Sequence, residues 1–349
     1  VSPDGTSYNP TDVQKIHQAY GRPFQLPNAT AHTETCANIG NVLWNWRMLQ
    51  ITADAKYADI VELALYNSVL SGISLEGKEF FYNNPLNVSK DLPFKQRWSK
   101  EREGYIALSN CCAPNVTRTI AEISNYAYNF SKEGLYVNLY GSNNLNSTTL
   151  SGEKIEIEQQ TNYPWDGKVT FKIVKAPKDI YAFLLRIPGW SQGTAIAING
   201  KNVDDAITSG TYYKIIRKWT KGDVIELNIP MPVELMQANP LVEEIKNQVA
   251  VKRGPIVYCL ESNELPTDVK VNDVILNLNS KFTTDFIKID NRQLLSITAS
   301  SSSVTDNSWD KKLYKPISTK ENKEYTVKLI PYFAWGNKGK GEMSVWLSH

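Results

Sequence analysis

The sequence has few cysteines, little net charge and no long apolar run. Four cysteines among 349 residues are too few for a disulfide-stapled scaffold, so metal binding or catalysis is the better use for three of them. A net charge of +2 indicates neither a nucleic acid nor an anionic membrane surface as a partner. No segment approaches the ~18 to 20 consecutive apolar residues of a spanning helix, so we expect no membrane-embedded segment either.

The residues that are present can form a large core, because 42% of them are hydrophobic. This length and composition predict two or three domains. Up to about residue 132, apolar residues recur at spacings of three and four, which is typical of helices. One helix is expected over Ile39 to Leu49, a second within Ala53 to Gly72, and a third with Pro114 in its first turn. The second is apolar on two faces, so we expect it to be packed on both sides.

Beyond Gly134 the pattern changes to short β-branched or alternating runs separated by turn residues. Asn199-Gly200 predicts a type I′ hairpin turn. The polar stretch from Glu261 to Lys323 predicts irregular loops with an edge strand or two. The expected strands are Leu135 to Tyr140, Lys154 to Gln160, Val169 to Val174, Ala182 to Ile187, Ala195 to Ile198, Tyr212 to Arg217, Val224 to Ile229, Gln248 to Lys252, Ile256 to Leu260, Val327 to Pro331 and Met343 to Leu347.

The most informative feature is the adjacent pair Cys111-Cys112, taken together with Glu34 and Cys36 upstream. Three thiols and one carboxylate make a complete tetrahedral ligand set for Zn²⁺. All lie near expected helix starts, where thiolates are favoured. From residue types alone, a closed structural zinc site that joins two helices is favoured over a catalytic one, because zinc with four protein ligands is normally structural. Cys259 lies in a predicted strand and is expected to be a small apolar core residue.

Five ordered motifs resemble glycoside hydrolase family 127, the β-L-arabinofuranosidase-like enzymes. The resemblance extends from about Gln18 to the last expected strand. The motifs are Leu26 to Cys36 (LPNATAHTETC), Ala64 to Asn67 (ALYN) with Leu70 to Gly72 (LSG), Cys111 to Asn115 (CCAPN), Leu185 to Trp190 (LRIPGW) and Arg253 to Pro255 (RGP).

This resemblance implies an α+β multidomain fold, in which part of an (α/α)₆ barrel is followed by two antiparallel β-sandwiches. The implied divisions are residues 1–132, 133–236 and 237–349. Such enzymes are retaining exo-glycosidases that act on terminal β-L-arabinofuranosides or a related plant-glycan sugar, with an oligosaccharide as substrate. Carried over residue by residue, the resemblance makes Glu34, Cys36, Cys111 and Cys112 the ligands of Zn²⁺ and Cys111 the nucleophile.

Three further positions are substrate-binding candidates. The resemblance places Tyr82 near the sugar, although a packed strand aromatic is an equal alternative. His32 lies two residues before Glu34 and is either a hydrogen-bond partner in the site or a core histidine. Gln18 lies sixteen positions before Glu34, where the family carries the glutamate that protonates the leaving group. A carboxamide has no proton to give at neutral pH, so Gln18 cannot be the general acid.

Three explanations for Gln18 compete, and we rank them in this order. The acid comes from protein outside this chain, it is another carboxylate within the chain, or the site is inactive or uses another substrate. The helix count favours the first, because an (α/α)₆ barrel has twelve helices and only about three or four precede the β region. The chain also opens at Val1 without a methionine. We therefore expect an N-terminal fragment that completes the barrel, or self-association that covers the apolar helix faces.

Two other functions fit the residues less well. A noncatalytic carbohydrate-binding protein with a structural zinc would explain the absent acid at Gln18. A zinc hydrolase that uses metal-bound water needs an open coordination position, and four protein ligands leave none. The expected substrate, a plant-cell-wall glycan, favours a periplasmic or secreted bacterial protein.

Overall fold

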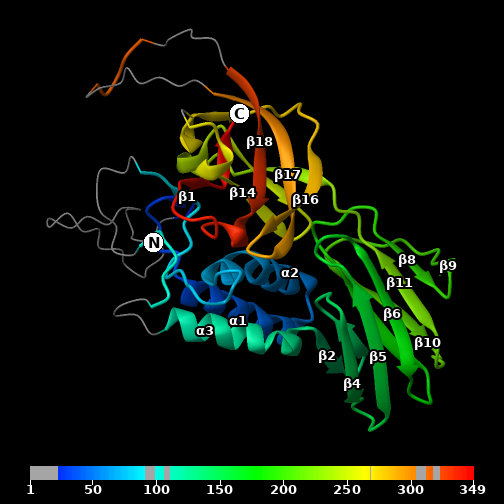
Figure 1. Cartoon of the computed structure of the whole chain (residues 1–349). Helices are drawn as coiled ribbons and strands as arrows, with labels where there is room; N and C mark the ends of the chain where they lie inside the picture. The colour runs from blue at the N-terminus through cyan, green and yellow to red at the C-terminus, as the bar shows by residue number, and fades with distance from the viewer. Residues whose placement is uncertain (1–22, 91–98, 106–110, 268, 304–311, 317–322) are drawn as a thin grey trace. The chain divides into compact units, whose positions relative to one another are not determined.

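The computed structural model describes residues 23–90, 99–105, 111–267, 269–303, 312–316 and 323–349 (Figure 1). The chain forms two compact units, each of which is built from separate stretches of the sequence. The first unit comprises Val1–Ala37, Asn67–Pro114 and Val233–His349, and the second comprises Asn38–Tyr66 and Asn115–Pro232. Within the described part of the chain, no helix combines the length and apolarity that crossing a membrane requires.

Three α-helices occur among the described residues: α1 (Thr35–Thr52), α2 (Ala55–Ala64) and α3 (Cys112–Ala121). They confirm the helices expected from periodicity, with Pro114 in the first turn of α3. The Asp54 carboxylate caps α2 by accepting a hydrogen bond from the Lys56 backbone nitrogen. After α2 the chain continues as a short π-helix (Leu65–Val69) and a short 3₁₀-helix (Leu70–Gly72).

The expectation that the second helix is packed on both sides is wrong for this structure. Val61 and Ala64 are buried on one face of α2, whereas Ile60 and Leu63 on the other are 37% and 42% exposed. The apolar side chains of that face therefore have room for further protein contacts. Apolarity on two faces predicts a preference for burial, but it cannot supply the partner that covers the second face.

Two sheets share one hydrophobic core in the second unit. Leu135 and Phe183 of one sheet and Ile157 and Phe171 of the other contribute buried side chains to it. The four-stranded sheet has the order β10-β7-β3-β2 and the six-stranded sheet the order β4-β5-β6-β11-β8-β9. The bounds are β2 Tyr128–Ser131, β3 Gly134–Val137, β4 Asn143–Thr148, β5 Lys154–Thr161, β6 Lys168–Lys175, β7 Tyr181–Ile187, β8 Ala195–Ile198, β9 Lys201–Asn202, β10 Thr211–Arg217 and β11 Val224–Asn228.

The turn between β8 and β9 confirms the predicted hairpin. Asn199 and Gly200 have φ angles of 52° and 77°, as a type I′ turn requires at both central residues. The pairing within this unit is not purely antiparallel, because β3 and β7 run parallel. In this respect the sequence-based expectation of antiparallel sheets is wrong. Strand direction depends on long-range pairing, which residue alternation does not report.

The first unit contains one ten-stranded sheet, coloured from yellow to red in its later strands (Figure 1). Its order is β1-β19-β14-β18-β17-β15-β20-β13-β12, with β16 beside β17 and an additional β13–β14 pairing, so the middle strands close a circuit. β15 and β20 are parallel. The bounds are β1 Asn87–Val88, β12 Val233–Gln237, β13 Gln248–Arg253, β14 Ile256–Glu261, β15 Val274–Leu276, β16 Thr283–Ile289, β17 Arg292–Ser303, β18 Lys323–Pro331, β19 Met343–Ser344 and β20 Trp346–Ser348.

Strand β17 corrects the expectation of loops and edge strands over Glu261 to Lys323. It is 12 residues long and pairs with β18 along one side and with β15 and β16 along the other. The strand ends in four serines, Ser300 to Ser303. The intrinsic preferences of these residues do not predict a strand. Ser301 donates from Oγ to the Tyr325 carbonyl oxygen at 3.3 Å. Pairing on both sides therefore overrides the local preference.

Candidate metal centre and active site

Glu34, Cys36, Cys111 and Cys112 converge in the first unit. Their ligand atoms all lie within 4.8 Å of one another. The sulfur of Cys112 is 3.5 Å from that of Cys36 and 3.7 Å from that of Cys111. The Glu34 Oε1 atom lies 3.6 Å from the Cys111 sulfur. The four residues that the sequence singled out thus form one cluster that could bind a metal ion.

The spacing of these atoms fits a tetrahedral metal ion. With Zn–S distances near 2.3 Å and a carboxylate distance near 2.0 to 2.2 Å, the edges of a tetrahedron measure about 3.5 to 3.8 Å. Four of the six distances lie in this range, namely those of Cys112 to Cys36, Cys111 and Glu34 and that of Cys111 to Glu34, and the remaining two are no longer than 4.8 Å. All cysteines in the structure are free thiols, so the cluster is not held by a disulfide. Soft thiolate donors select zinc over magnesium or calcium.

Two helix starts bring the ligands together. Cys36 is the second residue of α1 and Cys112 the first residue of α3. The unpaired backbone N–H groups and the dipole of a helix N-terminus favour a thiolate there. Between Glu34 and Cys36, the Thr35 nitrogen donates to the Tyr82 carbonyl oxygen at 2.9 Å, and its hydroxyl donates to the Phe81 carbonyl oxygen at 2.9 Å. The segment around Tyr82 therefore holds the start of α1.

The three thiols differ in their access to solvent. Cys112 is 1% exposed, Cys36 is half-buried and Cys111 is exposed. Burial raises the pKa of the Cys112 thiol well above its usual range, because an anion is disfavoured in apolar surroundings. A bound cation would remove that penalty. Among the three cysteines, Cys111 is therefore the most accessible to solvent.

Tyr82 and His32, both substrate-binding candidates, lie beside Glu34. The His32 Nε2 atom is 3.0 Å from the Glu34 Oε2 atom. The rings of His32 and Tyr82 meet edge to face, with centroids 5.6 Å apart. Burial and the Glu34 carboxylate, to which its hydroxyl is hydrogen-bonded, raise the pKa of Tyr82 well above its usual range. A tyrosine in this environment stays protonated and can donate a hydrogen bond.

Of Gln18 and Cys259, which the sequence also singled out, the structure describes only Cys259. Gln18 falls outside the described residues, so its expected position near the sugar stays a prediction. Cys259 is buried in β14 and is not among the grouped ligands, as expected for an apolar core residue. Sequence reasoning missed Thr35 as a residue that organises the site. Thr35 lies within the motif Leu26 to Cys36, but the motif did not indicate this role, because the role comes from contacts with residues more than forty positions away.

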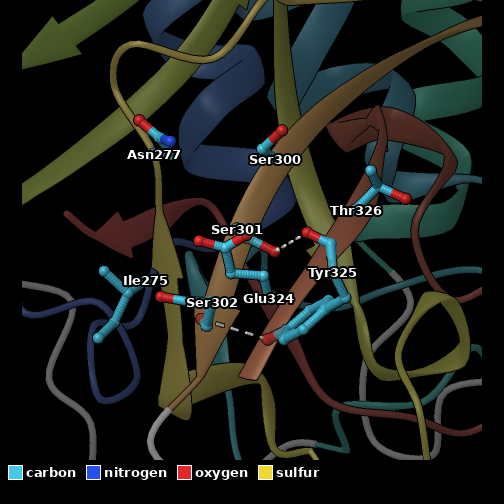
Figure 2. A pocket seen from close by; sticks show the side chains of 8 residues that line it. All are labelled: Ile275, Asn277, Ser300, Ser301, Ser302, Glu324, Tyr325 and Thr326. Carbon is cyan, nitrogen blue, oxygen red and sulfur yellow. Dashed lines mark hydrogen bonds between the residues drawn. The ribbon is translucent and has the colours of Figure 1, made fainter. Parts of the chain in front are cut away.

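A separate hollow of about 520 Å³ lies on the sheet of the first unit (Figure 2). Ser302 and Tyr325 on neighbouring strands line it, and the Tyr325 hydroxyl donates to the Ser302 carbonyl oxygen at 3.4 Å. Among its lining residues Glu324 is the only carboxylate, and none is a thiol or an imidazole. The hollow therefore lacks the paired reactive groups of the metal cluster. It is the weaker candidate for catalysis.

Comparison with known families covers nearly the whole chain. The β-L-arabinofuranosidase GH127 catalytic domain matches residues 6–125, the GH127 middle domain residues 134–231, and the family 127 C-terminal domain residues 233–348. The three matches occur in the order in which the domains are named. The chain therefore belongs to glycoside hydrolase family 127.

Characterised and solved proteins agree with this family. The chain is 29% identical over 343 residues to a non-reducing end β-L-arabinofuranosidase of Bifidobacterium longum subsp. longum, covering 95% of this chain and 51% of that protein. A GH127 β-L-arabinofuranosidase from Geobacillus stearothermophilus T6 matches with 36% identity and a TM-score of 0.86, covering 99% and 55% of the two chains. A solved glycoside hydrolase matches with 48% identity and a TM-score of 0.92, covering 99% and 57%. The chain spans about half the length of these relatives.

Proposed function

We propose that this chain carries the nucleophile of a retaining exo-glycosidase that hydrolyses terminal β-L-arabinofuranosides or a related plant-glycan sugar. The observation that carries the proposal is that Cys111 is exposed in a Cys₃Glu cluster whose other members are buried, as Glu34 and Cys112 are, or half-buried, as Cys36 is. A zinc ion held by Glu34, Cys36, Cys111 and Cys112 would keep the thiols ionised at neutral pH. Similarity to enzymes named as β-L-arabinofuranosidases supports the sugar.

The reaction would proceed in two displacements at the anomeric carbon. In the first, the Cys111 sulfur forms a bond to that carbon while the bond to the leaving oxygen breaks, and an acid protonates the oxygen. In the second, a water oxygen attacks the same carbon, the carbon–sulfur bond breaks, and the conjugate base of the acid takes a proton from water. Two inversions give retention of configuration. Tyr82 and His32, which flank Glu34, would form hydrogen bonds with sugar hydroxyls, and the Tyr82 oxygen would accept one because its own proton is donated to Glu34.

A noncatalytic carbohydrate-binding protein is the second candidate. It is favoured by the carboxamide of Gln18, which replaces an acid. In that case the metal cluster would only join the starts of α1 and α3. Sugar binding would then survive removal of the metal, and no turnover would occur at any pH.

The decisive experiment compares two cysteine variants with p-nitrophenyl β-L-arabinofuranoside as substrate. Cys111→Ala is expected to remain folded and to lose turnover, because the attacking sulfur is gone. Cys259→Ala removes a thiol outside the cluster and is expected to keep it. Retention of full activity in Cys111→Ala would remove the nucleophile assignment. Binding of L-arabinose without any turnover in the unaltered protein would favour the carbohydrate-binding alternative.

We further propose that the exposed apolar faces of the helices pack against additional helices, from the half of full-length relatives that this chain does not span. Trp44 on α1 is 68% exposed and Ile51 is 77% exposed. Leaving such area in water costs roughly 25 cal/mol per Å². A purified fragment that corresponds to the other half of a family member should shift the fluorescence of Trp44 to the blue. An unchanged spectrum in the presence of the fragment, with the chain monomeric, would contradict this proposal.

A further inference from the structure

Arg102 is a half-buried cation whose side-chain hydrogen bonds, among the described residues, all go to backbone carbonyl groups. Its Nη1 donates to the Ser71 carbonyl oxygen at 3.0 Å, and its Nη2 donates to those of Trp335 and Phe333 at 2.9 and 3.3 Å. Burial lowers the pKa of Arg102 to about 10, although the Glu79 and Glu261 carboxylates nearby oppose the shift. The guanidinium therefore remains charged at neutral pH. It joins the backbone at Ser71 to the Phe333–Trp335 segment, which is far away in the sequence.

The same guanidinium holds the ring of Phe81. Its central carbon lies 4.2 Å from the ring centroid of Phe81, which also stacks on Trp335 at 4.3 Å with an angle of 11° between the planes. Next to Trp335 stands Gly336, where an added Cβ would lie 2.9 Å from the Phe81 Cζ atom. The close approach therefore requires glycine. Phe81 is buried and has no free space in which to move.

Phe81 is joined to the metal cluster through one residue. Its carbonyl oxygen accepts a hydrogen bond from the Thr35 hydroxyl, and the next carbonyl oxygen, that of Tyr82, accepts one from the Thr35 nitrogen. The Tyr82 carbonyl oxygen also lies 3.7 Å from the Cys112 sulfur. Because the ring of Phe81 is held in place, the backbone of Phe81 and Tyr82 is held as well. This backbone sets the direction of the Tyr82 side chain toward Glu34.

We propose that Arg102 is a positioning residue, which acts on the reaction by holding Phe81 and, through it, the Tyr82 hydroxyl beside the nucleophile. This inference rests on the proposed glycosidase function. Displacement of a substrate-facing group by about 1 Å can cost up to ~100-fold in rate. We therefore expect Arg102→Met to lower kcat/KM by about 10- to 100-fold. The effect should depend on the presence of the Tyr82 hydroxyl.

A double-mutant cycle tests this dependence. Arg102→Met, Tyr82→Phe and the double variant are compared in kcat/KM for p-nitrophenyl β-L-arabinofuranoside and in L-arabinose affinity. If Arg102 acts through Tyr82, the Arg102→Met loss largely disappears in the Tyr82→Phe background. Arg292→Met removes an exposed arginine on β17 and should have no effect. Metal content should be equal in all variants.

Two results would overturn the inference: an Arg102→Met loss of equal size in both backgrounds, or a Tyr82→Phe variant as active as the unaltered protein. Should Arg102→Met not fold, Arg102→Lys keeps the charge but loses the fork of donors, and the same coupling to Tyr82 is expected. The outcome is separable from that of the main proposal. If Cys111→Ala is inactive and the cycle is additive, only the role of Arg102 fails. If Cys111→Ala keeps full turnover, the proposed function fails first.

Discussion

The sulfur atoms of Cys36 and Cys112 lie 3.5 Å apart, although the two residues are 76 positions apart in the sequence. That separation is far longer than the ~2.05 Å of a disulfide bond. It corresponds to two ligands on one tetrahedral ion. A tetrahedral ion bound by both sulfurs would join the starts of α1 and α3 more strongly than the thiol–thiol hydrogen bond at this distance.

Metal analysis gives the first prediction. The protein purified under reducing conditions should contain one zinc ion per chain by mass spectrometry. Loss of a residue that hydrogen-bonds to a metal ligand weakens metal binding by ~10- to 100-fold. Cys36→Ser removes a ligand itself and should weaken zinc binding by more than that. Cys259→Ser is the matched control and should bind zinc normally. A Cys36→Ser variant with unchanged zinc affinity in a chelator competition would contradict the assigned ligand set.

The second prediction concerns the buried ion pairs of Arg186 in the second unit. This residue is fully buried in β7 and bonds the carboxylates of Asp59 and Glu62 on α2. Burial alone would lower the pKa of Arg186, but the two carboxylates hold it well above the usual value. Arg186→Met leaves both carboxylates without their cation and should cost about 3 to 5 kcal/mol of unfolding free energy in denaturant titrations.

An ion pair with a partly exposed cation provides the control for that change, because its buried carboxylate, that of Asp223, also accepts hydrogen bonds from Asn199 Nδ2 and the Thr220 nitrogen. Arg217 is partly exposed and lies 3.9 Å from Asp223, so Arg217→Met should cost about 0 to 1 kcal/mol. Adding Glu62→Gln to Arg186→Met should cost less than the sum of the single changes, because both act on one network. Equal losses for Arg186→Met and Arg217→Met would mean that burial does not set the strength of the pair.

Gly167 gives the third prediction. A Cβ at this position would lie 2.7 Å from the Ile229 carbonyl carbon, and the Gly167 carbonyl accepts a hydrogen bond from the Ile229 nitrogen. Gly167→Ala must therefore push two bonded segments apart and should lower the melting temperature by several degrees. Gly141→Ala, where a Cβ meets nothing within 4 Å, should leave it nearly unchanged. If both variants melt alike, the backbone approach at Gly167 is not as tight as described.

Lys100 predicts a pH dependence of stability. Its Nζ atom is buried without a hydrogen-bond partner among the described residues, and burial lowers its pKa from 10.5 to about 7. Between these two values the unfolded chain binds a proton that the folded chain does not. Stability should therefore rise with pH across this window and be lowest below pH 7.

Removing the amine tests that dependence. Lys100→Met should raise the melting temperature at pH 7 and flatten its rise toward pH 10, measured by calorimetry. Lys154→Met on the exposed side of β5 should leave the pH profile unaltered. A profile for Lys100→Met that follows the unaltered protein would show that this ammonium is solvated in the folded state.

Local sequence patterns predicted much of the fold and the composition of the site. The apolar spacing of α1 and α2, the proline in the first turn of α3 and the Asn199-Gly200 turn are set by nearby residues. Strand β17 escaped prediction, because a serine-rich segment becomes a strand only through neighbours on both sides. The parallel pairing of β3 and β7 escaped for the same reason.

The sequence by itself determined which four side chains meet at the cluster, because three thiols and a carboxylate near helix starts have few other uses. Only the tertiary structure decided that Cys111 is the exposed thiol and that Arg102 holds Phe81 behind Tyr82. The exposure of Cys111 and the contact of Arg102 with Phe81 depend on which distant segments of the chain pack around these residues. Those contacts join residues as far apart in the sequence as Arg102 and Trp335. Contacts between such distant residues produce no periodic pattern of residue types from which they could be predicted.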